Sequence, residues 1–260
     1  MNPPTLHLIG PGKVGLTLAT IFWNNGFFTQ GDTLGKKSPI ERENFSAGDW
    51  VLITVPDDLI PKVFKELTSK VDLPLKVWHC SGVLSSKDLP NSHHQLASVH
   101  PAKSIAKVMS LEEWRLSPCA FGIEGDPSLL AHLQSVFQPL YPKAWIPLNS
   151  EQKVGYHLAQ TLACNYLITL QQEGFGQLSD LGLSSTEAKS ILEPLLESTL
   201  QNLNKVDSPI SALTGPVARE DKETLFKHQE FLKTNPKRFV FWKSLVKRTK
   251  ELLNDYSRSQ

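Results

Sequence analysis

Short apolar runs alternate with amphipathic segments along the first part of this 260-residue chain. Strand candidates lie at residues 6–9, 50–55, 75–80 and 97–100, and the run at 50–55 is nearly continuously apolar. Such runs are typical of strands that are buried on both faces of a parallel sheet. Amphipathic segments over residues 13–25 and 59–68 predict helices, and two further strands are expected at residues 119–123 and 143–147, at an edge of the sheet. The alternation predicts an α/β fold with a doubly wound sheet.

After residue 149 the pattern changes, because helical periodicity replaces the short apolar runs. The chain is long enough for one large domain or two modest ones. We therefore expect an α/β domain over residues 1–149 and an all-α domain over residues 150–260.

Three helices stand out in the second part. Residues 151–172 are unusually apolar, so we expect this helix to be buried on most sides. Ser184 and Glu187 form a capping-box pattern that starts another helix. Residues 236–255 form a basic amphipathic helix, which is interpreted as packed core with a solvated face rather than as a membrane or nucleic-acid binder.

Three glycines follow the first strand at the G-x-G-x-x-G spacing and precede the first helix. Gly10 permits a tight turn, Gly12 lets the backbone approach a pyrophosphate, and Gly15 lets the helix pack closely on the strand. The pyrophosphate would lie at the helix N-terminus, where free N–H groups and the helix dipole favour an anion. The predicted contacts are Gly10, Pro11, Gly12, Lys13, Val14 and Gly15. The alternative, a glycine-rich turn that binds nothing, is less favoured in this context.

The second strand is weakly marked, but the residues expected at its end are informative. An NAD site places an acidic residue there, about 20 residues beyond the glycine turn, to bind the ribose 2′-hydroxyl. Here the segment contains Lys36, Lys37 and Ser38, which suit a 2′-phosphate and favour NADP over NAD. Asp32 is close enough to make the register ambiguous, and a solvated basic turn is the alternative.

Five strand ends carry residues of interest, namely Gly10, Lys36, Pro56, Ser81 and His100. In open α/β sheets, ligands bind outside the carboxyl ends of the strands. Any one of these residues could be a plain turn residue. As a set they predict a binding rim along one edge of the sheet.

Polar residues recur every fourth position in the apolar helix that follows residue 149. Lys153, His157, Thr161 and Asn165 share one slowly drifting helix face. Buried polar groups are costly unless they are paired or face a wet cavity. They either lock the domains together or line a substrate cleft, where a lysine of lowered pKa and a histidine could exchange protons. Lys153 could instead be solvent-exposed on the first helical turn.

Residues 211–221 interrupt the helical pattern at a Gly-Pro pair. Thr214, Arg219 and Asp221 are expected at a helix entrance, where an anionic substrate group or a capping carboxylate is favourable. A capped turn with a local Arg–Asp pair is the slightly favoured explanation.

Composition and charge exclude several classes of function. The formal net charge is +1, so no strong field points to nucleic acid or to a membrane surface. We find no secretory signal and no apolar stretch of the roughly 18–20 residues that a membrane span needs. Three widely spaced cysteines suit a reducing compartment, so a cytoplasmic location is expected. The histidines and cysteines lack metal-ligand spacings, and no G-x-S-x-G nucleophile motif is present.

These landmarks together resemble a family of Rossmann-like proteins with a helical C-terminal domain of unknown function, related to the 6-phosphogluconate dehydrogenase and pyrroline-5-carboxylate reductase superfamily. The resemblance covers nearly the whole chain. Its motifs are Leu-Ile-Gly-Pro-Gly-Lys-Val-Gly, Thr54-Val55-Pro56-Asp57-Asp58, His79-Cys80-Ser81-Gly82, His100-Pro101, Tyr156-His157 with Asn165-Tyr166, and Ala212-Leu213-Thr214-Gly215-Pro216-Val217-Ala218-Arg219. Glu220 stands where the family has glycine.

The resemblance implies a Rossmann-type sheet, a nicotinamide cofactor and a homodimer formed through the helical domain. Enzymes of the superfamily carry a Ser-Gly pair near the nicotinamide, which Ser81 and Gly82 match. They also carry a lysine and, four residues later, an asparagine at the start of the long helix. Lys153 matches the lysine, and His157 takes the place of the asparagine.

The sequence therefore predicts an NADP-dependent oxidoreductase acting on a small carbonyl, hydroxyl or imine compound. Lys153 would be the general acid/base and His157 would assist it, while Asn165 and Ser81 would hydrogen-bond the reacting atom. The remaining predicted contacts are Val55, Pro56 and Gly82 to the cofactor, and His100, Thr214 and Arg219 to the substrate. Two alternatives stay open, a non-catalytic NADP-binding or sensing module and a deazaflavin-linked NADP reductase.

Overall fold

The computed structural model describes residues 3–259, which divide into two compact units, Met1–Ile168 and Thr169–Gln260. We describe each unit by itself. Residue 149, at which the sequence predicts a boundary between functional domains, is the N-cap of α5 (Ser150–Ala163). The assignment of separate cofactor and helical domains stays a prediction.

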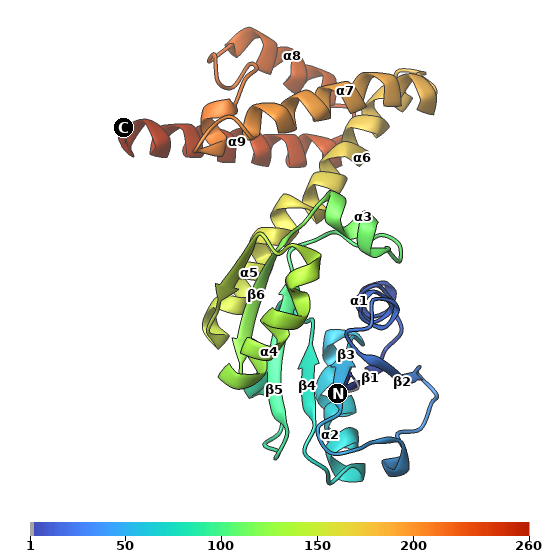
Figure 1. Ribbon diagram of the computed structural model, residues 1–260. Helices are drawn as coiled ribbons and strands as arrows, with labels where there is room; N and C mark the ends of the chain where they lie inside the picture. Colours follow the sequence, from blue (N-terminus) through green and yellow to red (C-terminus); the bar gives the residue numbers. More distant parts are fainter. Residues whose placement is uncertain (1–2, 260) are drawn as a thin grey trace. The chain divides into compact units, whose positions relative to one another are not determined.

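One seven-stranded sheet forms the centre of the first unit (Figure 1). Its strands are β1 (Thr5–Ile9), β2 (Thr29–Leu34), β3 (Trp50–Ile53), β4 (Lys76–His79), β5 (Gln95–Pro101), β6 (Ala120–Gly125) and β7 (Ala144–Pro147). They lie in the order β2-β1-β3-β4-β5-β6-β7. The five strands from β2 to β5 in this order are parallel, whereas β6 runs antiparallel to β5 and parallel to β7. The chain therefore has the predicted doubly wound α/β sheet.

Helices cover both faces of this sheet, as the alternation of strand side chains requires. On one face, Trp78, Val99 and Phe121 join a core that includes residues of α1 (Lys13–Asn24), α3 (Leu111–Leu116) and α4 (Pro127–Phe137). On the other face, Val51, Ile53 and Val77 pack with α2 (Ile60–Lys70). At the pairs Ser98–Glu124 and His100–Gly122, β5 and β6 carry small or polar residues on that second face, where α5 packs.

Helix caps explain where several helices begin. The Asp126 side chain accepts hydrogen bonds from two backbone N–H groups at the start of α4. Asn149 and Gln152 form a capping box at the start of α5, and Ser184 and Glu187 form the predicted one at the start of α7 (Ser185–Leu203). In contrast, the N-cap residue of α1 is Gly12, so no side chain caps this helix.

The prediction of a single helix over residues 151–172 is wrong. The structure has two helices, α5 and α6 (Asn165–Asp180), which are separated at Cys164. The φ of Cys164 is −115°, far from the helical value near −63°, and this local distortion is not visible in the hydrophobic pattern.

The expected burial of this helix is also not found in the single chain. Only Lys153 is buried in α5, whereas the apolar side chains Val154, Leu158 and Leu162 are more than half exposed. These three lie four residues apart and form one apolar stripe on α5 that stays more than half exposed.

The second unit contains the rest of α6 together with α7, α8 (Lys222–Leu232) and α9 (Pro236–Ser259) (Figure 1). Asp221 caps α8 by accepting a hydrogen bond from the Thr224 N–H group. Just before it, Glu220 has a φ of 53°. This left-handed conformation explains why glycine is expected at that position. Arg238 of α9 binds Glu173 and Asp180 of α6.

Short 3-10 helices lie at Arg42–Asn44, Asp57–Leu59, Ser86–Asp88, Gln138–Leu140 and Pro209–Ala212. Among residues 3–259, no helix has the length and apolar character needed to cross a membrane.

Candidate functional site

The glycine turn between β1 and α1 has the geometry that its spacing predicts. Gly10 has a φ of 94°, and a Cβ there would lie 2.7 Å from the Val55 nitrogen. A Cβ at Gly15 would lie 2.1 Å from Thr54 Oγ1, so α1 can approach the sheet only without a side chain. A Cβ at Gly12 would meet nothing within 4 Å. Gly10 and Gly15 thus allow close packing, and Gly12 leaves open space in front of the helix N-terminus.

A cavity of about 500 Å³ lies in front of this turn. Of the predicted cofactor contacts, those that line it are Gly10, Pro11, Gly12, Lys36, Ser38, Val55 and Pro56. The others, namely Lys13, Val14, Gly15, Lys37, Ser81 and Gly82, are not part of its lining. Thr54 and Lys62 line the cavity without having been predicted. The Thr54 hydroxyl donates to the Gly10 carbonyl (2.6 Å) and so fixes the glycine turn.

The end of β2 resolves the ambiguous register around Asp32. Asp32 lies two residues before the end of the strand, and its carboxylate accepts a hydrogen bond from the Asn44 side chain (2.6 Å). The turn that follows is closed by Ser38, whose hydroxyl accepts from the Gly35 N–H (3.1 Å). Lys36 and Ser38, and no carboxylate, therefore face the cavity at this strand end.

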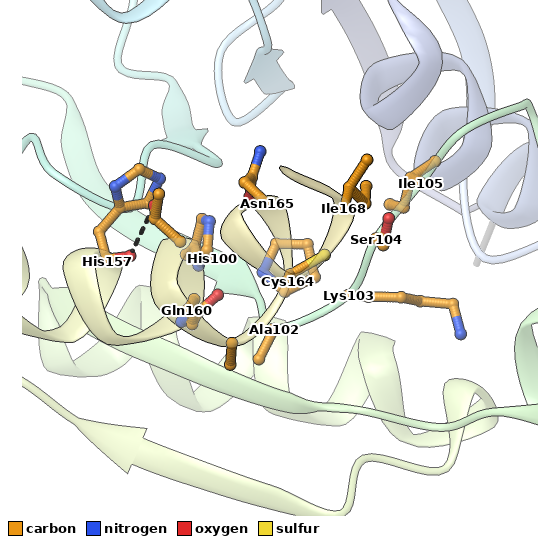
Figure 2. Close-up of a pocket in the computed structure, with 13 residues that line it drawn as sticks. His100, Ala102, Lys103, Ser104, Ile105, His157, Gln160, Cys164, Asn165 and Ile168 are labelled. Atoms are coloured by element: carbon orange, nitrogen blue, oxygen red, sulfur yellow. Dashed lines mark hydrogen bonds between the residues drawn. The ribbon is translucent and has the colours of Figure 1, made fainter. Parts of the chain in front are cut away.

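A second cavity, of about 410 Å³, lies at the carboxyl end of β5 beside α5 and the start of α6. Figure 2 shows His100 and His157 at one end of this cavity, while the Lys103 side chain extends away from them. Thr161 and Asn165 line it too, so three members of the predicted polar stripe face one cavity. The fourth member, Lys153, does not line it.

Two glycines allow α5 to lie close to the sheet. A Cβ at Gly82 would lie 2.4 Å from His157 Cδ2, and one at Gly122 would lie 2.7 Å from Tyr156 Cζ. His100 lies between these two rings, with ring centroids 5.8 Å apart in each pair. Because Gly82 and Gly122 have no side chains, the two α5 rings can lie where they do, and these rings form the environment of His100.

Lys153 is completely buried beneath this site, which contradicts the alternative that it is solvent-exposed. Its Nζ donates to the Ser98 hydroxyl (2.6 Å) and to the Ser81 carbonyl (3.1 Å). The Ser98 hydroxyl donates to the same carbonyl (3.1 Å). Burial lowers the pKa of Lys153 to about 8, although the Glu124 carboxylate opposes this shift. The ammonium group therefore holds the Ser81 backbone rather than facing the cavity.

Burial also keeps neighbouring groups uncharged. It lowers the pKa of His100 to about 4, with smaller contributions from His157 and Lys153, so the His100 imidazole is neutral at pH 7. It lowers the pKa of His79 to about 3. His79 Nδ1 accepts from the Ser81 N–H (3.2 Å). Burial raises the pKa of the Cys80 thiol to about 12, so Cys80 is not a thiolate nucleophile.

The other predicted site residues occupy different positions. The Ser81 hydroxyl accepts from the backbone N–H groups of Val83 (3.2 Å) and Leu84 (2.9 Å), so it organises the turn after β4. Thr214 and Arg219 are exposed and lie in the second unit, between the last 3-10 helix and α8. Among residues 3–259, no group of three or more His, Cys, Asp or Glu side chains could hold a metal ion.

Sequence reasoning assigned no role in the site to three residues that shape it, namely Ser98, Gly122 and Tyr156, although Tyr156 belongs to a motif of the family resemblance. Ser98 has a clear local signal, because it is a polar residue between the apolar residues Ala97 and Val99. Gly122 pairs with His100 across β5 and β6. That contact depends on the antiparallel register, which no local pattern predicts.

Solved structures with the same fold match nearly the whole chain. A candidate NADP oxidoreductase from Bacteroides fragilis superimposes with a TM-score of 0.77 at 17% identity, over 96% of this chain and 99% of that one. A protein from Thermotoga maritima gives 0.70 at 22% identity, over 97% and 99%. The reductive aminase from Aspergillus terreus, in complex with NADPH and ethyl-5-oxohexanoate, gives 0.65 at 13% identity, over 99% and 94%. At these identities the likeness shows the fold, a Rossmann-type sheet followed by a helical region.

No protein of curated function matches the chain in sequence. A family match is found over residues 119–249, which include β6, β7, α5 and the helices of the second unit up to most of α9. This segment is slightly more than half of the chain. The chain therefore belongs to the family described as domain of unknown function DUF2520.

Proposed function

We propose that this protein is an NADP-dependent oxidoreductase that transfers a hydride between nicotinamide and a small carbonyl, hydroxyl or imine substrate. The observation that carries the proposal is the cradle at the first cavity. There an uncapped helix N-terminus, open space at Gly12 and the Lys36 cation at the end of β2 meet. Two proteins of the same fold support it, since one is described as a candidate NADP oxidoreductase and the other holds NADPH.

The residues present fit a dinucleotide along the carboxyl ends of the strands. The first turn of α1 would hold the pyrophosphate, because its N–H groups have no side-chain cap and Gly12 leaves open space in front of them. Lys36 and Ser38 would hold the 2′-phosphate. Strands β1 and β4 are two strand spacings apart, about 10 Å. An extended dinucleotide can span this distance, so its nicotinamide would reach the turn at Ser81 and Gly82.

When bound, the nicotinamide supplies or accepts the hydride, and the protein must then move one proton. Four titratable residues line the second cavity beside this turn, namely His100, His157, Lys103 and Cys164. His100, neutral at pH 7, can donate one N–H to a carbonyl oxygen or an imine nitrogen. Lys153 lies behind them, and we assign it as a positioning residue that holds the Ser81–Gly82 turn.

We also propose that the protein forms a homodimer through its helical region. The exposed stripe of Val154, Leu158 and Leu162 on α5 supports this proposal. Exposed apolar side chains in the second unit, such as Leu195 and Val240, add to it. Exposed apolar side chains that line one helix face are typical of protein interfaces.

The cofactor proposal is tested by titrating the protein with NADPH and with NADH and following the fluorescence of its six tryptophans. We expect NADPH to bind at least about tenfold more tightly, which corresponds to about 1.4 kcal/mol. Gly12→Ala should fold normally, because a Cβ there meets nothing within 4 Å, yet weaken NADPH binding by filling the cradle.

Gly155→Ala on α5 is the matched control. Its Cβ also meets nothing within 4 Å, but it lies outside both cavities described above. It should bind NADPH like the wild type. Binding of neither nucleotide to the wild type, or unchanged binding in Gly12→Ala, would overturn the proposal, and a preference for NADH would overturn the assignment of NADP.

A further inference from the structure

One face of α2 is directed at the first cavity, opposite the turn that follows β2. Leu59, Lys62, Val63 and Glu66 all line it, at the i, i+3, i+4 and i+7 spacing of a single helix face. Leu59 and Val63 provide an apolar surface. Lys62 adds a cation from a different element than the one that carries Lys36.

The charges at this cavity are unbalanced. Within residues 3–259, neither Lys36 nor Lys62 forms an ion pair with an acidic side chain. The one acidic residue of the lining, Glu66, lies 2.8 Å from the Lys70 ammonium group and is therefore compensated. Two cations thus face the cavity without a protein counter-charge.

The position of Lys62 along α2 is unfavourable for a lysine in the absence of a ligand. It lies in the first turn, where the helix dipole disfavours a cation, and that turn contains no acidic residue. Asp57 and Asp58 precede the helix but do not line the cavity. The dipole and the ammonium group therefore create a positive potential in the same place.

We propose that Lys62 is a specificity-determining residue, which binds the 2′-phosphate of the cofactor together with Lys36 and Ser38. The inference rests on the proposed function and identifies α2 as the second half of the phosphate site. Ser38 contributes its O–H as a donor, because its oxygen already accepts from the Gly35 N–H. The two ammonium groups act as point charges on a dianionic phosphate. Lys37 does not line the cavity and is not part of this site.

The test compares Lys62→Met with Lys65→Met, each of which removes one exposed lysine charge from α2. Lys65 does not line the cavity. Isothermal titration measures the Kd of four probes, namely NADPH, NADH, adenosine 2′,5′-bisphosphate and AMP. We expect Lys62→Met to weaken the two probes with a 2′-phosphate by about tenfold, because a charge-assisted contact is lost. NADH and AMP should change less than about twofold, because they lack that group.

Two further measurements make the result specific. Lys62→Arg should retain most of the discrimination between NADPH and NADH, because it keeps the charge. The loss in Lys62→Met should shrink as the salt concentration rises, since exposed charges are screened.

Equal losses for NADPH and NADH in Lys62→Met, or equal losses in the two methionine variants, would overturn the inference. If the wild type prefers NADPH and Lys62→Met keeps that preference, the inference fails while the proposed function stands. If the wild type binds none of the four probes, the proposed function fails with it.

Discussion

At the scale of single residues, Lys153 is a buried cation whose protonation must affect folding. Its pKa is lowered by burial to about 8, from an ordinary value of 10.5. Between these values the unfolded chain binds the proton more tightly, so the free energy of unfolding rises with pH. Relative to Lys153→Met, we expect the wild type to gain stability between pH 8 and about 10.5, by at most about 1.4 kcal/mol per pH unit. Urea unfolding at several pH values measures this difference.

The comparison with Lys153→Met removes the contributions of other groups that titrate in the same range. Burial raises the pKa of Cys80 to about 12, against a smaller opposing effect of Lys153, so its titration lowers the free energy of unfolding of both proteins as the pH rises. Parallel pH profiles for the two proteins would contradict the prediction. They would mean that Lys153 titrates in the folded protein as it does in the unfolded chain.

The same residue shows how far the sequence could predict the site. Spacing predicted that Lys153 and His157 share a helix face and that His100 ends a strand on the predicted binding rim. The structure places all three around the turn at Ser81 and Gly82. The burial of Lys153 was not predictable, because it depends on Ser98, a residue of the opposing strand. The role that we propose for Lys62 was likewise hidden, since a lysine on an amphipathic helix is usually a solvated residue.

At the scale of elements, α5 lies against the sheet only because Gly122 leaves room for Tyr156. A Cβ at Gly122 would lie 2.7 Å from the ring, so Gly122→Ala must displace the ring or the helix. We expect this variant to lower the free energy of unfolding by about 1–3 kcal/mol, as overpacking does. In a Tyr156→Ala background the same change should cost much less, because the ring is absent. A double-mutant cycle by urea denaturation measures the coupling.

Gly155→Ala supplies the control on the same helix, because its Cβ would meet nothing within 4 Å. It should keep or raise the stability, since alanine is the better helix former. An equal cost of Gly122→Ala in both backgrounds would show that Tyr156 does not determine how close α5 lies.

Elements with a strong local pattern were predictable, and those defined by distant contacts were not. The buried strand β3 is a continuous apolar run, and the capping box at Ser184 starts α7 as expected. β2 was poorly marked because it is an edge strand with mostly exposed or half-exposed residues. The antiparallel direction of β6 has no local signature, because alternation looks the same in either direction.

At the scale of the whole molecule, the second unit has almost no core of its own. Among the described residues 169–259, the buried apolar residues are Ala188, Leu225 and Leu232. Large apolar side chains elsewhere in this unit, such as Phe226, Phe231 and Val240, are more than half exposed. A folded unit needs far more apolar burial than this to offset its conformational entropy. A second copy of the chain would supply the missing contacts.

The dimer proposal predicts the effect of a charge within the exposed stripe of α5. Leu158→Glu places two like charges in the interface, so it should convert a dimer into a monomer at micromolar concentration, as measured by analytical ultracentrifugation. Leu116→Glu is the matched control, because Leu116 is 86% exposed on α3, and it should remain dimeric. A stable dimer must bury roughly 1,200–2,000 Å², which a single leucine cannot provide, so the second-unit helices must contribute. A wild-type protein that stays monomeric would therefore leave both apolar surfaces unexplained and contradict the proposal.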